Sequence, residues 1–312
     1  MRYTLFAGGR IGYESLKHMS AQTVQIDQVF VEPEHPHEQI PYSSMIKELC
    51  EERDIKVSDQ LDKANVLSVC ECISSDYLMC FGYRRMLSPE VCACAQIACI
   101  GSHFAPLPRY RGFAPLNWVL INGEKQTAVN IFFLADKVDA GDIIASRVID
   151  ISYDDDINTL TEKCVQAMPE VLSKALIQLE TGKPCGERQD ESKATYTCSR
   201  NPEDGLIDWT KSSEEIYNLV RALTYPMPGA YTYYNGEKLY VWRCQIVDEL
   251  PYEGRVCGKI IAINPNKEIK VLTGNGSLWL TKLSADPNQP DVNPYEFKSI
   301  RVTLGHPNIV QA

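Results

Sequence analysis

The order of short apolar runs and amphipathic helical patterns along residues 3–182 leaves few folds open. Apolar runs with the length of buried strands occur at residues 3–7, 24–31, 55–58, 76–83 and 97–102. Helical patterns lie between them or follow them, at residues 12–19, 43–54 and 86–96, the last with Ser88 as N-cap and Pro89 at the first helical position. Strands that alternate with helices at this spacing predict an α/β fold, a Rossmann-like, doubly wound and mostly parallel sheet.

The second half of the chain changes character. A helix (114–123), two strands (127–134 and 143–152) and a long helix (156–182) complete the first pattern, and the composition then turns polar. Beyond one more helix, several short strands with turn signals predict a smaller C-terminal β-rich, barrel-like domain. We therefore expect a catalytic domain over residues 1–190, a linker over 191–206 and the β-rich domain over 207–312.

The net charge of the chain favours some kinds of binding partner over others. The chain has 31 basic and 41 acidic residues, a formal net charge of −10, which disfavours a nucleic-acid partner because phosphate binding depends on clustered basic side chains. The densest basic group, Arg84, Arg85, Arg109 and Arg111, suits a small anionic ligand better.

The cysteines and the N-terminus bear on location. Twelve cysteines include two C-x-C pairs, at 70–72 and 92–94, without the paired spacing of a zinc site, so we expect no metal and reduced, mostly buried thiols. The first residues, MRYTLFAGGR, are too short an apolar run for a signal peptide, and no window has the length of a membrane span. We expect a cytoplasmic protein with no membrane partner.

One loop combines a histidine with arginines, prolines and a glycine: residues 99–113, CIGSHFAPLPRYRGF. Together with the next residues (RGFAPLNWVLINGE) and the later KVDAGDIIA, it resembles the folate-dependent formyltransferases. That family carries Asn-x-His, Ser-Leu-Leu-Pro, a basic-aromatic-Arg-Gly run and a later Asp-x-Gly-Asp. The sugar N-formyltransferase branch is the most similar, in particular the formyltransferase part of the enzyme that modifies UDP-4-amino-4-deoxyarabinose, and the similarity continues at residues 207–209 and 216–242.

The resemblance implies transfer of a formyl group from N10-formyltetrahydrofolate to the primary amine of a nucleotide-linked amino sugar. In this reaction the amine loses a proton, the carbonyl oxygen becomes an oxyanion and the folate nitrogen regains a proton. His103 matches the family's catalytic histidine and Asp139 its carboxylate. Arg109, Tyr110 and Arg111 are expected at the substrate. The expected folate contacts are Arg85, Met86, Leu87, Ala135, Asp136, Lys137 and Val138.

The sequence departs from the family two residues before His103, where Gly101 replaces an asparagine whose amide helps to hold the formyl oxygen. Ser102 is the adjacent candidate for this task, although neighbouring side chains of a strand point to opposite faces. Loss of one oxyanion donor costs about 3 kcal/mol of transition-state stabilisation. The family's Ser-Leu-Leu-Pro is here Ala105-Pro106-Leu107-Pro108.

Two other functions remain open. Methionyl-tRNA formyltransferases share the motifs and the two-domain layout, but the acidic balance disfavours a tRNA partner. A silent module that binds folate or a nucleotide sugar would explain the loss of the asparagine, whereas the retained His103 and Asp139 favour an enzyme. Analogy with the sugar-modifying relatives implies a homodimer.

Overall fold

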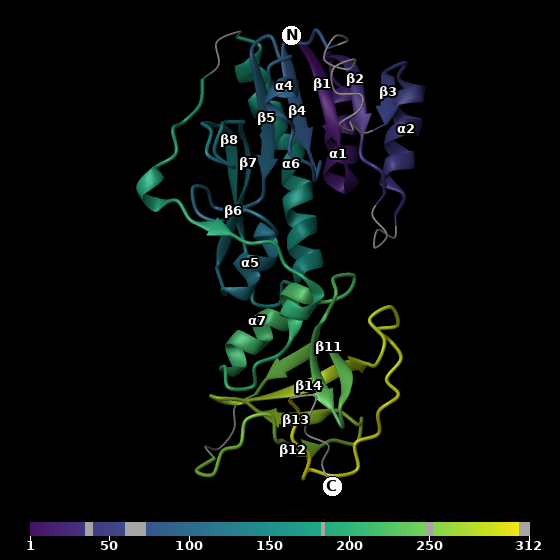
Figure 1. Ribbon diagram of the computed structural model, residues 1–312, viewed down its shortest axis with the longest axis vertical. Helices are drawn as coiled ribbons and strands as arrows, with labels where there is room; N and C mark the ends of the chain where they lie inside the picture. The colour runs from purple at the N-terminus through teal and green to yellow at the C-terminus, as the bar shows by residue number, and fades with distance from the viewer. Residues whose placement is uncertain (35–39, 60–72, 182–184, 248–251, 306–312) are drawn as a thin grey trace. The chain divides into compact units, whose positions relative to one another are not determined.

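A seven-stranded sheet in the order β3-β2-β1-β4-β5-β7-β8 forms the scaffold of the first part of the chain in this computed structural model (Figure 1). The structure describes residues 1–34, 40–59, 73–181, 185–247 and 252–305. The strands are β1 (Arg2–Ala7), β2 (Gln25–Val31), β3 (Lys56–Asp59), β4 (Tyr77–Phe81), β5 (Ala98–His103), β7 (Gln126–Phe133) and β8 (Ile143–Asp150). Neighbours from β3 to β5 are parallel, whereas β7 runs antiparallel to both β5 and β8. The predicted Rossmann-like, mostly parallel sheet is confirmed.

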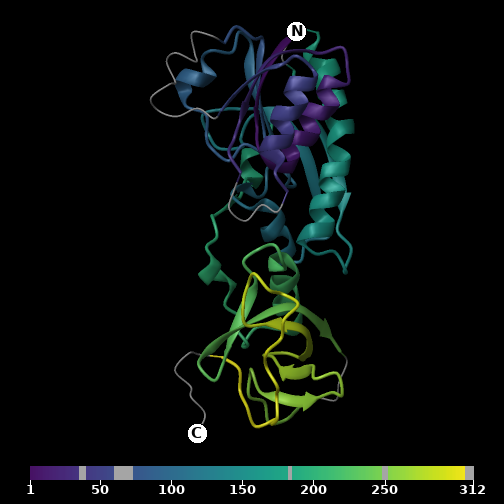
Figure 2. The ribbon, with the colours of Figure 1, turned by 90° about the vertical axis from the view of Figure 1, so that its right-hand side faces the viewer.

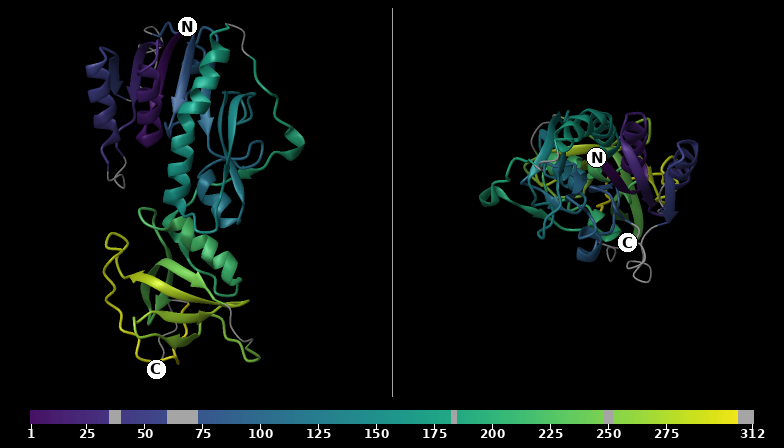
Figure 3. Two further views of the ribbon diagram at one scale, coloured as in Figure 1. Left: turned by 180° about the vertical axis from the view of Figure 1, so that it is seen from behind. Right: turned by 90° about the horizontal axis from the view of Figure 1, so that it is seen from above.

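Helices cover both faces of this sheet. Figure 2 shows α1 (Gly9–Ser20), α2 (Tyr42–Glu52) and the long α6 (Ile157–Leu179) on one face, and the short α4 (Pro89–Cys92) on the other. The apolar stripe of α1, with Leu16 and Met19, is buried on the sheet side, as the helical spacing predicts. A hydrogen bond of 2.7 Å between His18 Nε2 and Ser173 Oγ joins α1 to α6, which follows the length of the sheet (Figure 3).

The predicted helix over residues 86–96 is wrong in its length. Only one turn forms, with Ser88 at the N-cap and Pro89 at the first helical position, as predicted. Beyond Cys92 the chain continues in tight turns, in which Cys94 and Ala95 donate their N–H groups to carbonyls three residues back. Val91 is the one residue of the turn that is buried, so packing does not support a longer helix.

The chain divides into two compact units. The first comprises Met1–Pro115, Gln126–Asp150 and Thr161–Thr197, and the second Leu116–Lys125, Ile151–Leu160 and Cys198–Ala312. The domain boundaries at 190 and 206 stay a prediction.

The second unit contains a separate antiparallel sheet in the order β10-β11-β14-β13-β12, which confirms the predicted β-rich fold. Its elements are α5 (Pro115–Ile121, whose first residue belongs to the first unit), α7 (Ser213–Leu223), β10 (Ala230–Tyr234), β11 (Glu237–Ile246), β12 (Ile260–Ile263), β13 (Ile269–Leu272) and β14 (Ser277–Ser284). A capping box between Ser212 and Glu215 starts α7. Asn235 and Gly236, both with positive φ, make the two-residue turn between β10 and β11.

The described cysteines are free thiols, while the pair at 70–72 lies outside the described residues. In the part of the chain that the structure describes, no helix combines the length and the apolar character needed to cross a bilayer.

Two glycines lock the turn after β1 against the end of β4. The N–H of Gly8 donates to the Phe81 carbonyl at 3.1 Å, and Gly82 follows with φ +64°. A Cβ on Gly82 would lie 2.2 Å from the Gly8 carbonyl oxygen, so only glycine fits. This contact fixes how the chain leaves β4 toward residues 84–87.

We predict that Gly82→Ala lowers the free energy of unfolding by more than about 2 kcal/mol, because it adds a backbone clash to an unfavourable φ. Urea denaturation followed by circular dichroism measures this. Gly254→Ala is the matched control, since a Cβ there meets nothing within 4 Å. Equal midpoints for the two variants would contradict the interpretation.

Candidate active site

Strand β5 carries the predicted catalytic histidine at its last position. Because side chains alternate along a strand, Cys99, Gly101 and His103 share one face of β5 and Ser102 points to the other. The pairing of β5 with β7 is regular here, with Ser102 opposite Ile131 and His103 opposite Asn130. No bulge brings Ser102 round to the face of His103, and its catalytic role stays a prediction.

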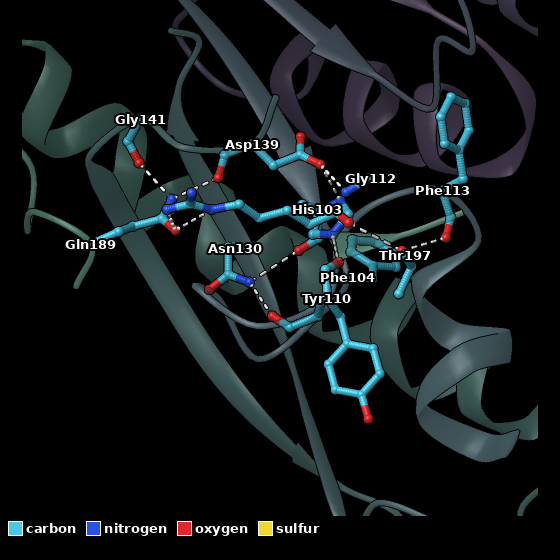
Figure 4. Close-up of polar contacts among 12 residues, drawn as sticks. His103, Phe104, Tyr110, Gly112, Phe113, Asn130, Asp139, Gly141, Gln189 and Thr197 are labelled. Carbon is cyan, nitrogen blue, oxygen red and sulfur yellow. Dashed lines mark hydrogen bonds and ion pairs between the residues drawn. The ribbon is translucent and has the colours of Figure 1, made fainter. Parts of the chain in front are cut away.

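The two ring nitrogens of His103 have different partners (Figure 4). Nε2 lies 2.7 Å from the carbonyl oxygen of Tyr110, and Nδ1 lies 3.5 Å from Oδ2 of Asp139. A carbonyl only accepts hydrogen bonds, so Nε2 carries the hydrogen and Nδ1 is the nitrogen left for proton exchange. The side chains are 8% and 18% exposed, so the pair is buried but not sealed.

The loop after β5 is held by side chains from other strands. Asn130 of β7 donates through Nδ2 to the carbonyls of His103 and Ala105, and its Oδ1 accepts from Ser146 of β8. Thr197 Oγ1 lies 3.1 Å from the Arg111 carbonyl oxygen and 2.7 Å from that of Phe113. These contacts fix the start and the end of the loop.

Short strands add to this support. The strand β6 (Arg111–Gly112) pairs in parallel with β9 (Tyr196–Thr197), which lies in the segment predicted as the linker. Tyr110, Gly112 and Ala114 all have positive φ, with values of +62°, +102° and +47°. Left-handed backbone at non-glycine residues is typical of functional sites, where surrounding contacts hold it in place.

Asp139 also has a left-handed backbone, with φ +52°, in the turn between β7 and β8. Its Oδ2 accepts the N–H of Gly112 at 2.8 Å. Nε2 of Gln189 donates to the carbonyl oxygens of Asp139 at 2.8 Å and Gly141 at 2.7 Å. The carboxylate and its turn are therefore held from both sides.

Arg111 is fully buried, with 0% exposure. Its guanidinium donates to Gln189 Oε1, to Glu191 Oε1 at 2.6 Å and to the Tyr196 hydroxyl. Burial alone would lower the pKa of Arg111, but the hydrogen bonds with Glu191 and Tyr196 raise it above its usual value. The same hydrogen bond from Arg111 lowers the pKa of Glu191.

The predicted substrate residues occupy different environments. Arg109 is exposed, with its guanidinium 5.1 Å from the ring centroid of Tyr110. Tyr110 and Arg111 are buried, and the contacts that the structure gives them are with the protein itself. Of the three, Arg109 is the exposed side chain.

The two predicted folate segments meet at one hydrophobic cluster. Arg85 and Met86 are exposed after β4, and residues 135–138 are exposed after β7. Leu87, and Leu134 directly before the second segment, both pack against the cluster that includes Cys99 and Val91. Cys99 belongs to the face of β5 that carries His103, so the segments border the same face of the sheet.

The place of the family's asparagine is filled by apolar side chains. A Cβ on Gly101 would lie 2.8 Å from Leu134 Cδ2 and 3.4 Å from the Phe132 ring. An asparagine at 101 would therefore need Leu134 to move.

Three supporting residues escape sequence reasoning: Asn130, Gln189 and Thr197. Asn130 could have been found from the sequence, because it is a polar residue inside the apolar run 127–134. Gln189 and Thr197 lie in a polar stretch that reads as surface, and their partners are 48 to 86 residues away in the sequence.

Solved structures with low sequence identity share this fold. The N-formyltransferase from Helicobacter canadensis, in complex with folinic acid and dTDP-3-aminofucose, has a TM-score of 0.68 at 15% identity, over 90% of this chain and 99% of that one. WlaRD, a sugar 3N-formyltransferase with dTDP and 5-N-formyl-THF, has a TM-score of 0.67 at 15% identity, over 89% of this chain and 96% of that one.

A third similar structure is longer. HypX from Aquifex aeolicus, in complex with tetrahydrofolic acid, has a TM-score of 0.63 at 17% identity, over 91% of this chain and 44% of that one. This chain thus spans less than half the length of HypX.

The family comparison agrees with the motifs around His103 and Asp139. A model described as formyl transferase matches residues 8–176, more than half of the chain, and one described as formyl transferase, C-terminal domain, matches residues 200–297. The predicted family is therefore confirmed, and this chain belongs to the formyl transferase family.

Proposed function

We propose that this protein transfers the formyl group of N10-formyltetrahydrofolate to the primary amine of a nucleotide-linked amino sugar. The observation that carries the proposal is the fixed imidazole of His103, with Nε2 held by a carbonyl and Nδ1 beside Asp139. Family membership and the folate ligands of the similar structures support the donor.

The residues around β5 fit a folate. Residues 85–86 and 135–138 are exposed and would bring backbone polar groups to a pterin ring, and Leu87 and Leu134 would offer apolar contact. When bound, N10-formyltetrahydrofolate supplies the formyl carbon and a tetrahydrofolate leaving group. Arg85, Met86, Leu87 and residues 135–138 are the proposed binding residues.

The pair His103 and Asp139 handles the protons. Nδ1 accepts the proton that the attacking amine loses, and the Asp139 carboxylate stabilises the imidazolium that results. The same nitrogen returns a proton to the leaving nitrogen. Because Nε2 stays hydrogen-bonded to Tyr110, the ring keeps its orientation through both transfers.

The oxyanion receives less help than in relatives with the asparagine. Asn130 does not substitute, because Nδ2 already donates to two carbonyls. The Gly112 N–H does not either, because it donates to Asp139. With Asn130 and Gly112 engaged elsewhere, we expect the chemical step to be slower than in those relatives, by the roughly 10²- to 10³-fold that one missing donor costs.

The nucleotide sugar as acceptor rests on three observations. The similar structures WlaRD and the Helicobacter canadensis enzyme contain dTDP or dTDP-3-aminofucose. The exposed Arg109 suits the phosphate charge of such a ligand. The net charge of −10 disfavours tRNA as the alternative acceptor.

We predict tetrahydrofolate release with at least one member of a panel of dTDP- and UDP-linked amino sugars, and a loss of about 10²- to 10⁴-fold in kcat for His103→Ala. Chromatography of tetrahydrofolate and mass spectrometry of the sugar measure both. His18→Ala is the control, because His18 bonds to Ser173 on helices away from the site. No turnover with any sugar, despite folate binding, would refute the acceptor and favour the silent module.

We further predict that Gly101→Asn with Leu134→Ala raises kcat by about 10-fold or more over Leu134→Ala, because the asparagine restores an oxyanion donor and the alanine removes the contact with its Cβ. The control is Leu134→Ala alone, which enlarges the space beside residue 101 without adding an amide. If the double variant is no faster than Leu134→Ala, the missing asparagine does not limit the rate.

A further inference from the structure

We propose that Arg111 and Gln189 form a buried clamp that positions Asp139 against His103, so that both are positioning residues and neither contacts the substrate. The proposal rests on the proposed function, in which Asp139 assists His103. Figure 4 shows Gln189 beside the turn that carries Asp139 and Gly141.

The guanidinium of Arg111 determines which way the Gln189 amide faces. Arg111 donates to Gln189 Oε1 from Nε at 3.2 Å and from Nη2 at 2.8 Å. Since a guanidinium only donates, the amide oxygen must face it and the amide NH₂ must face away. Both hydrogens of that NH₂ then reach the carbonyls of Asp139 and Gly141.

The turn that carries Asp139 and Gly141 has an unfavourable backbone conformation that needs support from neighbouring residues. Asp139 has φ +52°, and a Cβ on Gly141 would lie 1.7 Å from the Phe133 carbonyl oxygen. A tight left-handed turn of this kind persists only when its surroundings fix it. The two Gln189 hydrogen bonds hold the carbonyls on both sides of the turn, while the Gly112 N–H holds the carboxylate.

The burial and the charge pairing of Arg111 and Gln189 indicate a structural role for the two side chains and not ligand binding. Arg111 is 0% exposed and Gln189 6%, so a substrate does not reach either side chain. Glu191, with its side chain 47% exposed, neutralises Arg111 from the solvent side. The buried cation is therefore paired and hydrogen-bonded, as a structural arginine must be.

Gln189→Glu tests the clamp, because glutamate keeps the acceptors for Arg111 and loses both donors to the turn. We expect kcat to fall at least 10-fold with the same amino sugar, and by a larger factor than the affinity for folinic acid, because the clamp acts on Asp139 and only indirectly on residues 135–138. Hydrogen exchange of peptides covering residues 135–142 should accelerate. Gln178→Glu, an exposed position on α6, makes the same charge change and should match the parent.

Gln189→Met is the second variant, since it removes the amide without adding a charge next to two carbonyls. The clamp would be overturned if kcat and the hydrogen exchange of residues 135–142 were unchanged in both variants. It would also be overturned if kcat and the affinity for folinic acid fell by the same factor. If the parent protein shows no formyl transfer, the proposed function fails, and the clamp is then tested by hydrogen exchange alone. Faster hydrogen exchange at residues 135–142 in the variants supports the clamp, and unchanged hydrogen exchange overturns it.

Discussion

The hydrogen bond from His103 Nε2 to the Tyr110 carbonyl is the contact on which the site depends. It selects one tautomer and leaves Nδ1 as the nitrogen that gains and loses a proton. Its acceptor belongs to a residue with φ +62°, so the bond exists only while the loop after β5 keeps its shape. The scaffold around it, Asn130 on β7 and Thr197 on β9, maintains that shape.

The proposed reaction also requires a carboxylate beside Nδ1 of His103. The direction of β7 does not by itself bring Asp139, which follows this strand, to that position. Since β7 runs antiparallel to β5, its last residues pair near the start of β5, as Phe133 does with Ile100. The turn that follows must therefore fold back to bring Asp139 to the end of β5. Buried polar contacts from a distant segment stabilise such a turn, provided that every donor and acceptor is satisfied.

The sequence predicts the elements better than the contacts between them. The periodic runs locate nearly every strand, and the Asn235-Gly236 turn follows from local chemistry. The helix after β4 fails because a short apolar stretch with Ser and Pro signals starts a helix without the packing to extend it. His103 and Asp139 come together only through the resemblance, because spacing along a chain does not reveal a turn that folds back. Gln189 carries no local signal at all.

The most direct test is the tautomer of the neutral His103 ring, read from the ¹⁵N shifts of its two ring nitrogens. We predict that Nε2 carries the hydrogen and that Nδ1 carries none, as the contact with the Tyr110 carbonyl requires. A ring that keeps its proton on Nδ1, or that exchanges between both tautomers, would contradict the account.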